Sequence, residues 1–332
     1  MPPTNSDQAL LTVQAGRSCP LAYRYHPSDI AQAATEEAET LYVIGGLYGN
    51  PFALASVLAM AAAEKHPVTL CFNGDFNWFN IDHPTFQQIN HTVLQHHAIQ
   101  GNVEYELHQE NSDAGCGCAY PEHVAHEVVE RSNQIHAQLQ QTARHFPQLQ
   151  QQLSQLPLYR RYQLGSHKIG VVHGDAQSLA GWQFDAAHLR QIKNDPALAD
   201  LFALADVDVF ASSHTCLPIL KQIKAGKKAE NNRVNTIINN GAAGMPNFQH
   251  TQYGVLSRIS LHPCATQSLY SAHIAHPGKH LQIDALAIEF DDAAWQSHFL
   301  HNWPAESAAY ASYFQRICAG PEWTIHQANA LI

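Results

Sequence analysis

The chain has 332 residues, enough for one large α/β domain or two small ones with a sizeable core. Hydrophobic residues make up 45% of it, an ordinary globular value, whereas charged residues make up only 14%, so Gln, Asn and 23 His supply much of the polarity. The formal net charge of -10, without a Lys/Arg block, argues against nucleic acid as a partner. Metal ions or backbone amides can still create a local site for phosphate in an acidic protein.

The start of the chain and the cysteines bear on where the protein resides. Residues 1–11 have neither a cationic start nor an apolar core, so we do not expect a signal peptide. The longest apolar run, residues 52–63, is about a dozen residues long and too short to cross a bilayer. The seven Cys are scattered except for Cys116 and Cys118 and suggest no disulfide framework. We therefore expect a cytoplasmic protein with no membrane partner, and no pattern indicates its oligomeric state.

The first third of the chain alternates short apolar runs with helical stretches. Strands are predicted at residues 40–44, 68–72 and 98–100, and helices at 51–63 and 84–95 between them. Pro51 opens the first helix, where its missing N–H costs no hydrogen bond. This βαβαβ order predicts a largely parallel sheet.

Residues 121–156 differ in composition, because Gln, His and Glu dominate them. Apolar residues recur there at helical spacing: Val124, Val128, Ile135 and Leu139. The pattern predicts two helices broken near Pro147. The pair either forms a cap or insertion laid over the sheet, or packs on the core as amphipathic helices.

Strand-like runs return after this segment, at residues 168–172, 207–211, 234–238, 254–261 and 280–290. The tail, residues 291–332, is rich in aromatic side chains that we expect to pack back onto the core. We see neither an internal repeat nor a long linker, so the chain is predicted to form a single domain.

Several predicted strands end in a short Gly- or Ser-containing turn that carries a metal-type ligand. The ligands are Asp75, Asn102, His173 and His214. In an open α/β sheet, ligands gather outside the carboxyl ends of the strands, so these four side chains are expected to converge. Their mixed oxygen and nitrogen donors suit a divalent transition ion such as zinc, iron or manganese.

The order of these turns resembles the calcineurin-like metallophosphoesterase family, whose motifs are D-x-H, G-D, G-N-H-[DE], a later His-Gly, and G-H-x-H. The corresponding segments here are residues 46–50, 73–75, 101–104, 172–174 and 213–216, and residues 239–244 resemble the family's later N-P-G-S turn. The resemblance spans roughly residues 40 to 290. It implies a four-layer α/β/β/α sandwich, with a core at about 38–290, a helical cap or insertion at about 121–156 and an aromatic-rich extension at about 291–332.

The resemblance also implies which metal site is complete. One ion of the family takes the residues that match Asp75, Asn102, His173 and His214 here, and all four are present. The other ion takes an Asp and a His of the first motif and the last His of G-H-x-H, where this chain has Gly46, Tyr48 and Cys216. We therefore expect one divalent transition ion. A second ion requires substitute ligands.

Four side chains are candidate substitutes or lining residues of the site: Tyr48, Cys116, Cys118 and Cys216. A thiolate binds soft metals well, and a phenolate binds ferric iron, although a packing or hydrogen-bonding role is the favoured interpretation of Tyr48. Residues 116–118 have a tighter spacing than a C-x₂-C zinc knuckle, so they also read as a redox pair or as a loop without a chemical role.

Five further residues are expected to surround the ligands: Asn50, Asn73, Glu104, Asp175 and Asn240. Asp175 either hydrogen-bonds a ligating imidazole or caps the helix that follows it. Glu104 takes the acidic place of G-N-H-[DE], but the His that this acid steadies in the family is Val103 here.

The resemblance implies hydrolysis of a small phosphorylated substrate, a phosphate mono- or diester, by a metal-bound water. Val103 stands where the family has its general acid, so the general acid is unknown. The alternative is a catalytically degenerate protein of this fold that binds metal or ligand in a regulatory role.

Overall fold

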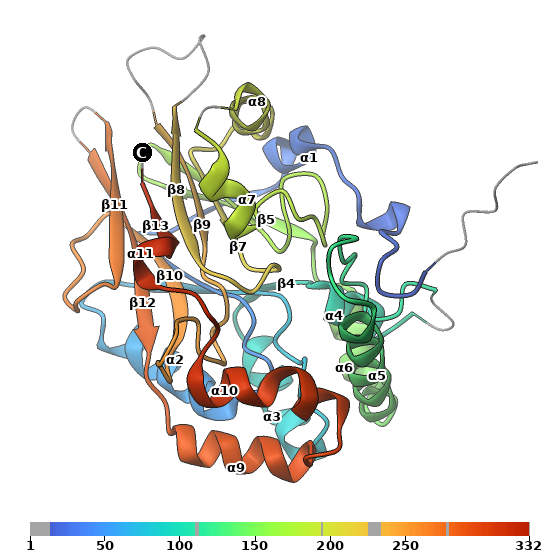
Figure 1. The fold of residues 1–332 in the computed structure, drawn as a ribbon. Helices are drawn as coiled ribbons and strands as arrows, with labels where there is room; N and C mark the ends of the chain where they lie inside the picture. The colour runs from blue at the N-terminus through green and yellow to red at the C-terminus, as the bar shows by residue number, and fades with distance from the viewer. Residues whose placement is uncertain (1–13, 110–112, 194, 225–233, 277–278, 332) are drawn as a thin grey trace, which may run out of the picture.

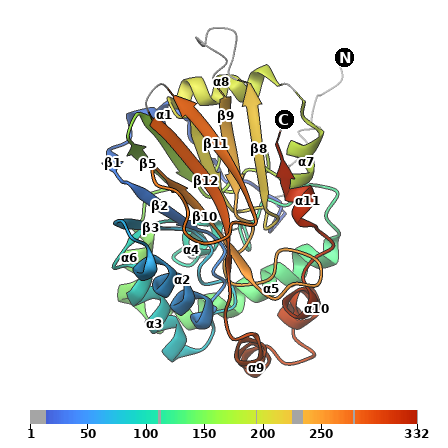
Figure 2. The ribbon, with the colours of Figure 1, turned by 90° about the vertical axis from the view of Figure 1, so that its left-hand side faces the viewer.

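A computed structural model describes residues 14–109, 113–193, 195–224, 234–276 and 279–331 (Figure 1). The expectation for residues 1–11 lies outside these ranges. Two β-sheets lie face to face in the middle of the molecule, and helices cover their outer faces (Figures 1 and 2). This arrangement is the predicted α/β/β/α sandwich.

The first sheet has seven strands among the described residues. In spatial order they are β1 (Thr35–Glu37), β5 (Tyr159–Leu164), β6 (His167–Val172), β7 (Val209–Ser212), β9 (Val234–Asn239), β8 (Ile219–Lys224) and β13 (Asn329–Ala330). The central strands β6, β7 and β9 run parallel, whereas β5 and β8 pair antiparallel with β6 and β9.

The second sheet has six strands within the same ranges. In spatial order they are β11 (Tyr270–His276), β12 (Lys279–Ile288), β10 (Gly254–Ser260), β2 (Thr40–Ile44), β3 (Val68–Asn73) and β4 (His97–Ile99). Here β2, β3 and β4 are parallel, as predicted from the βαβαβ order, and β10 joins them antiparallel.

Helices flank the two sheets on opposite sides. On the side of the first sheet lie α1 (Pro27–Gln32), α7 (Ala186–Gln191), α8 (Pro196–Ala205) and α11 (Ile325–Ala328); on the side of the second lie α2 (Pro51–Ala63), α3 (His83–Val93) and α9 (Asp292–Asn302) (Figures 1 and 2). The remaining helical segments are η1 (Leu21–Tyr23), α4 (Asn102–Glu106), α5 (His126–Ala143), α6 (Pro147–Ser154), the π-helical η2 (Tyr310–Phe314) and α10 (Gln315–Ala319).

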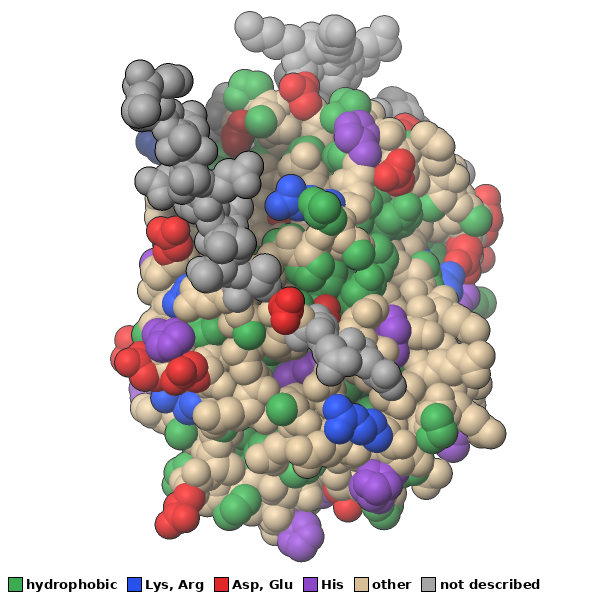
Figure 3. Space-filling model, turned by 90° about the vertical axis from the view of Figure 1, so that its right-hand side faces the viewer, with side chains coloured by type: hydrophobic (Ala, Val, Ile, Leu, Met, Phe, Trp, Pro, Cys, Tyr) green, Lys and Arg blue, Asp and Glu red, His purple; other side chains and the backbone are tan. Residues whose placement is uncertain are grey.

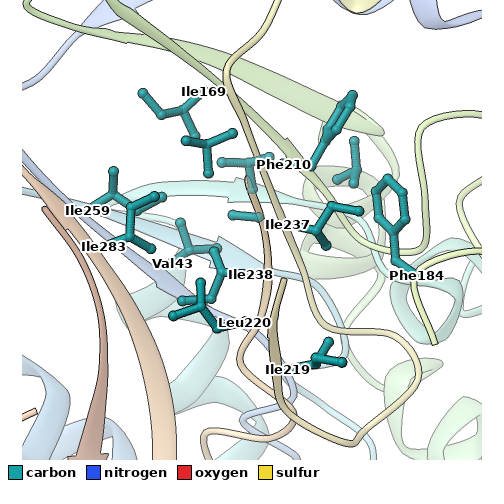
Figure 4. Packing of buried hydrophobic residues seen from close by; sticks show 14 of the residues in the cluster. Val43, Ile169, Phe184, Phe210, Ile219, Leu220, Ile237, Ile238, Ile259 and Ile283 are labelled. Atoms are coloured by element: carbon teal, nitrogen blue, oxygen red, sulfur yellow. The ribbon is translucent and has the colours of Figure 1, made fainter. Parts of the chain in front are cut away.

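Strand β2 is buried on both faces, which explains why its sequence is apolar without alternation. Leu41 and Val43 belong to the buried cluster between the sheets, whereas Tyr42 and Ile44 belong to the cluster under α2 and α3. A strand buried on both faces has no polar side to show. Figure 4 shows Val43 in the inter-sheet cluster beside Ile238 of the opposite sheet.

The parallel order predicted for the βαβαβ segment does not extend across either sheet, because hairpins add antiparallel strands at β5, β8, β11 and β12. The sequence concealed β5, since its Arg160, Arg161 and Gln163 interrupt the apolar signal of a strand. Their long side chains find partners nearby: Arg161, for example, donates from Nη1 to the carbonyl of Ala31 (2.8 Å).

The Gln-rich segment forms the two predicted helices, α5 and α6, which pack against α4 (Figure 1). The side-chain amides of Gln140 and Gln150 donate to the carbonyls of Glu106 and Leu107, at 2.8 and 2.7 Å. These carbonyls lie at the C-terminal end of α4, where a helix has no partners of its own for them. The glutamines thus supply hydrogen-bond donors to the last carbonyls of α4, which agrees with the packing alternative. The division of the chain into core, cap and extension stays a prediction.

The aromatic tail packs back onto the rest of the molecule. Trp295, Phe299 and Trp303 are buried in the cluster under the second sheet, and the Trp303 indole donates to the carbonyl of Phe79 (3.0 Å). This anchoring of α9 brings the following segments, η2 and α10, to the edge of the site described below.

The surface carries no continuous basic patch on the face seen in Figure 3, where Lys and Arg side chains are few and lie apart. Within the described ranges, no helix has both the length and the apolar character needed to cross a membrane.

Candidate metal centre

The first element of the site is the turn that follows β3. Gly74 and Asp75 both have left-handed backbones, with φ of +73° and +52°. A Cβ on Gly74 would lie 2.4 Å from the amide nitrogen of Gly101 and 2.7 Å from Nδ1 of His173. Glycine is therefore required for these three segments to approach one another. The turn is held by Glu104, whose Oε2 accepts from the Asp75 amide at 2.7 Å.

The four predicted ligands converge at this turn. Nε2 of His173 lies 3.4 Å from Oδ1 of Asp75, 3.2 Å from Oδ1 of Asn102 and 3.2 Å from Nδ1 of His214. All four side chains are buried. Asp75 and Asn102 come from the second sheet's strand ends, and His173 and His214 from the first, so the site lies where the two sheets meet.

Backbone carbonyls orient three of these side chains. Nδ1 of His173 donates to the Asn73 carbonyl (2.8 Å), Nε2 of His214 to the Cys118 carbonyl (3.1 Å), and Nδ2 of Asn102 to the Cys116 carbonyl (2.9 Å). These bonds leave the other imidazole nitrogens and the amide oxygen as lone-pair donors that face one another. Two lone pairs 3.2 Å apart repel unless a cation or a proton lies between them, so the donor set fits a divalent ion.

The electrostatics of the site agree with that arrangement. Burial would raise the pKa of Asp75, but the charge and hydrogen bond of His173 outweigh it and hold the pKa below its usual value. The same pairing raises the pKa of His173 despite its burial. Burial, followed by the charge of His173, lowers the pKa of His214 to about 3. Without a cation, the shifts of Asp75 and His173 both favour their charged forms, whereas His214 is neutral at pH 7.

Tyr48 and Cys216 fill the region where the resemblance places the second ion. The Tyr48 hydroxyl lies 2.7 Å from Sγ of Cys216, and a Cβ on Gly46 would lie 2.9 Å from the Tyr48 ring. Burial raises the pKa of both the Tyr48 phenol and the Cys216 thiol. Both groups are therefore neutral at pH 7 when no ion is bound, and a metal that used either as a ligand would have to displace its proton.

The loop of Cys116 and Cys118 reaches the site through its backbone. Its two carbonyls hold Asn102 and His214, and the Cys118 carbonyl also accepts from the Trp182 indole (3.1 Å). The Cys118 thiol lies at the cavity wall, 3.6 Å from Nδ2 of Asn102, and burial raises its pKa. The Cys116 thiol is buried and does not line the cavity.

The two acidic residues near the ligands are both held by backbone amides. Asp175 accepts from the amides of Gln177, Ser178 and Gln183 (2.8–3.1 Å), so it stabilises the loop after β6; within the part of the chain that the structure describes, it neither bonds an imidazole nor caps a helix. Glu104 accepts from Asp75 and Gly101 through Oε2 and from Asn77 through Oε1. Burial, then the charge of Asp75, raises the pKa of Glu104 to about 7.

The three asparagines expected around the ligands have different structural roles. Asn50 caps α2, accepting from the amides of Phe52 and Ala53. Asn240 ties two segments together by donating to the carbonyls of Gly45 and Val255. Asn73 orients His173 with its carbonyl, and its side-chain amide has no hydrogen-bond partner among the described residues.

A cavity of about 180 Å³ opens beside the ligands. Its walls include residues that the sequence did not single out: Trp78, Tyr120, Trp182, Thr215, Tyr313 and Arg316. Trp182 packs edge-on against His214, with ring centroids 5.5 Å apart. Tyr313 and Arg316 come from the tail. Apart from Thr215, the variable position of the segment 213–216, no motif marks these positions, so only the aromatic content of the tail hinted at a role. Neither α5 nor α6 contributes to the lining given above.

Solved structures with this fold include two that cover most of the chain. A metallophosphoesterase from Sphaerobacter thermophilus is 18% identical with a TM-score of 0.51, over 86% of this chain and 100% of that one. A hypothetical protein from Pyrococcus horikoshii OT3 is 11% identical with a TM-score of 0.53, over 86% of this chain and 99% of that one. No family model and no curated protein matches the sequence. The chain has the calcineurin-like metallophosphoesterase fold, as the order of its motifs led us to expect.

Proposed function

We propose that this chain is a metal-dependent phosphoesterase with a mononuclear centre held by Asp75, Asn102, His173 and His214. One observation carries the proposal: two imidazole nitrogens face each other at 3.2 Å, and backbone carbonyls fix the outer nitrogen of each ring. A divalent ion bound by these residues polarises a phosphoryl oxygen and lowers the pKa of water. The fit of the donor set supports zinc, iron or manganese.

The cavity supports a small phosphorylated substrate whose remaining part is flat and apolar. Its aromatic walls offer ring faces for stacking, from Trp78, Tyr120, Trp182 and Tyr313. Arg316 lines the same cavity and brings a guanidinium, which binds phosphate oxygens well. Its Nη2 donates to the Cys216 carbonyl (2.7 Å), which positions the group.

The absence of an acid at Val103 bears on the leaving group. The valine side chain has no ionisable group and cannot protonate a leaving group, and general acid assistance is worth about 10²–10⁴ in rate. We infer that the substrate is an ester whose leaving group is stable as an anion, such as an aryl phosphate. All seven cysteines are free thiols, which supports the proposal of a reducing, cytoplasmic setting.

The proposal is tested by stripping the protein of metal and restoring zinc, manganese or iron(II) separately. Turnover is then measured on p-nitrophenyl phosphate, bis(p-nitrophenyl) phosphate and an alkyl phosphate. We expect about one ion per chain that depends on Asp75 and His214, and turnover of an aryl ester well above that of the alkyl ester. Asp75→Ala and His214→Ala should each lose the ion and at least about 100-fold in rate. The exposed His301→Ala serves as control and should behave as the unmodified protein. Turnover no higher than that of Asp75→Ala would reject the phosphoesterase proposal.

The second candidate is a regulatory protein that binds metal or ligand without turnover. The neutral Tyr48–Cys216 pair and Val103 favour it, because they occupy three positions that the family's chemistry uses. Elemental analysis separates the candidates when combined with the assay above. One ion per chain that Asp75→Ala removes, without turnover, supports the regulatory protein, whereas two ions per chain that both depend on Asp75 show that Tyr48 or a cysteine serves as a ligand after all.

A further inference from the structure

A second group of potential ligands lies at the other end of the second sheet. Glu39, His66 and His262 have ligand atoms that all lie within 4.8 Å of one another. Glu39 precedes β2, His66 lies just before β3, and His262 follows β10. Asp75 follows β3, so this group and the candidate metal centre lie at opposite ends of the same strands.

Strand pairing brings the three residues together. The first residues of β2 and β3, Thr40 and Val68, are partners in the parallel pair. Thr40 is also the partner of Ser260, the last residue of β10. The three ligand-bearing segments thus lie side by side at the same end of the neighbouring strands β10, β2 and β3. Glu39 and His66 are exposed and His262 is half-buried, so an ion can reach the group from solvent.

A buried guanidinium fixes two of these segments. Arg258 is fully buried and donates from Nε to Oε1 of Glu64 (2.6 Å), two residues before His66. It also donates from Nη1 to the carbonyl of His262 (3.1 Å). The third segment is tied on by a backbone bond from the Leu261 amide to the Glu39 carbonyl (3.0 Å). The ligand-bearing backbone is therefore preorganised, which reduces the entropy cost of binding an ion.

The side chains are already in contact. Nε2 of His262 lies 2.9 Å from Oε2 of Glu39, and the rings of His66 and His262 are stacked with centroids 3.6 Å apart. An ion lies in the plane of each imidazole that binds it, so two parallel rings cannot share one. Binding therefore requires the exposed His66 ring to turn out of the stack toward the carboxylate.

We propose that Glu39, His66 and His262 form a second metal site, which takes zinc and clamps the ends of β2, β3 and β10. Two imidazoles and one carboxylate are a ligand set that proteins use for zinc, with water in the fourth position. The site is independent of the proposed phosphoesterase activity, because it shares no residue with the cavity.

The test compares zinc content after dialysis against chelator-buffered zinc, measured by elemental analysis. The unmodified chain is expected to bind one zinc more per chain than the double variant His66→Ala, His262→Ala. A second control removes two exposed histidines outside the group, His280→Ala with His301→Ala, and should keep the full zinc content. Glu39→Gln should weaken zinc binding at this site by at least about 10-fold, since it removes the only anionic ligand.

Cobalt(II) gives a second readout, because its visible d–d absorption is intense when four-coordinate with protein ligands and weak in water. In the His66→Ala, His262→Ala variant, we expect the absorption to fall by the contribution of one bound cobalt ion per chain. Phosphatase turnover should be unchanged. The melting temperature of the metal-free variant shows whether it is folded. Equal zinc content in a folded variant and in the unmodified chain would overturn the second site. Loss of turnover in Asp75→Ala bears only on the catalytic proposal.

Discussion

At the scale of single residues, His136 shows how strongly burial acts in this molecule. It lies on α5 and its Nε2 donates to the carbonyl of Val103 (3.2 Å). Burial lowers the pKa of His136 to about 4. The unfolded chain takes up this proton near pH 6.5 and the folded chain only near pH 4, so His136 makes stability fall as the pH drops through that interval.

We therefore expect His136→Gln, which keeps an N–H donor but does not titrate, to lose less stability on acidification. The difference from the unmodified chain should reach about 3 kcal/mol between pH 6.5 and pH 4. Urea unfolding at several pH values measures it. His126→Gln removes an exposed histidine from the same helix and should retain the original pH slope. Parallel pH profiles for His136→Gln and the unmodified chain would contradict the expectation.

Single residues also mark the limits of the sequence. Asp75, Asn102, His173 and His214 were predictable as neighbours, because each follows a strand whose apolar run ends at a turn. The cavity walls were not, since Trp182 and Arg316 reach the site from loops and from the tail, and tertiary packing alone decides where these lie. The role of the Cys116 and Cys118 carbonyls was equally unpredictable, because every residue has a backbone carbonyl and the sequence does not show which of them accept these bonds.

At the scale of elements, the loop of residues 115–118 orients ligands through its backbone, so its side chains and its conformation should have separable effects. Gly117 has φ of +68°, and a Cβ there would lie 2.1 Å from the Tyr23 hydroxyl. We expect Gly117→Ala to displace the loop and weaken metal binding about 10–100-fold, a usual effect of losing a ligand's supporting hydrogen bond. Cys118→Ser should leave affinity within about 3-fold, which metal titration against a chelator measures. A larger loss in Cys118→Ser would mean that its thiol is a ligand.

A single carboxylate, that of Glu104, holds the turn after β3 against the start of α4. Glu104 accepts from the amides of Asp75, Asn77 and Gly101, and a glutamine would turn one N–H₂ toward these donors. Glu104→Gln should therefore cost about 1–3 kcal/mol of unfolding free energy. Glu106→Gln, on the same helix, is the matched control, because its carboxylate accepts one bond from Tyr23 (2.6 Å) and its Oε2 has no partner among the described residues. Urea unfolding of both metal-free variants tests whether Glu104→Gln loses more unfolding free energy than Glu106→Gln does, and equal losses of free energy would contradict the expectation.

Elements also differed in how readable they were. The buried strands β2, β3 and β6 were found almost to the residue, because strands covered on both faces have largely apolar runs. The strands β5 and β8 were missed, since they carry charged residues such as Arg160 and Lys221 that lie at the sheet's margins.

At the scale of the whole molecule, the candidate metal centre joins the two sheets. Asp75 and Asn102 follow strands of one sheet, and His173 and His214 follow strands of the other. An ion bound only by the folded chain adds about 3–4 kcal/mol at 100–1,000 times its dissociation constant. We expect chelation to lower the melting temperature by about 5–10 °C, as scanning calorimetry would show. His173→Ala should remove most of this difference, and a melting temperature insensitive to chelator would contradict the bridging role.

The position of these four residues at the seam between the sheets has an evolutionary consequence. Selection for a stable fold would by itself preserve Asp75, Asn102, His173 and His214, even in a lineage that had abandoned hydrolysis. Their persistence among descendants of this chain would then be no record of activity. Loss of activity would instead be visible at the cavity wall, where Arg316 and Trp182 would be replaced by other residues once substrate binding no longer selected for them.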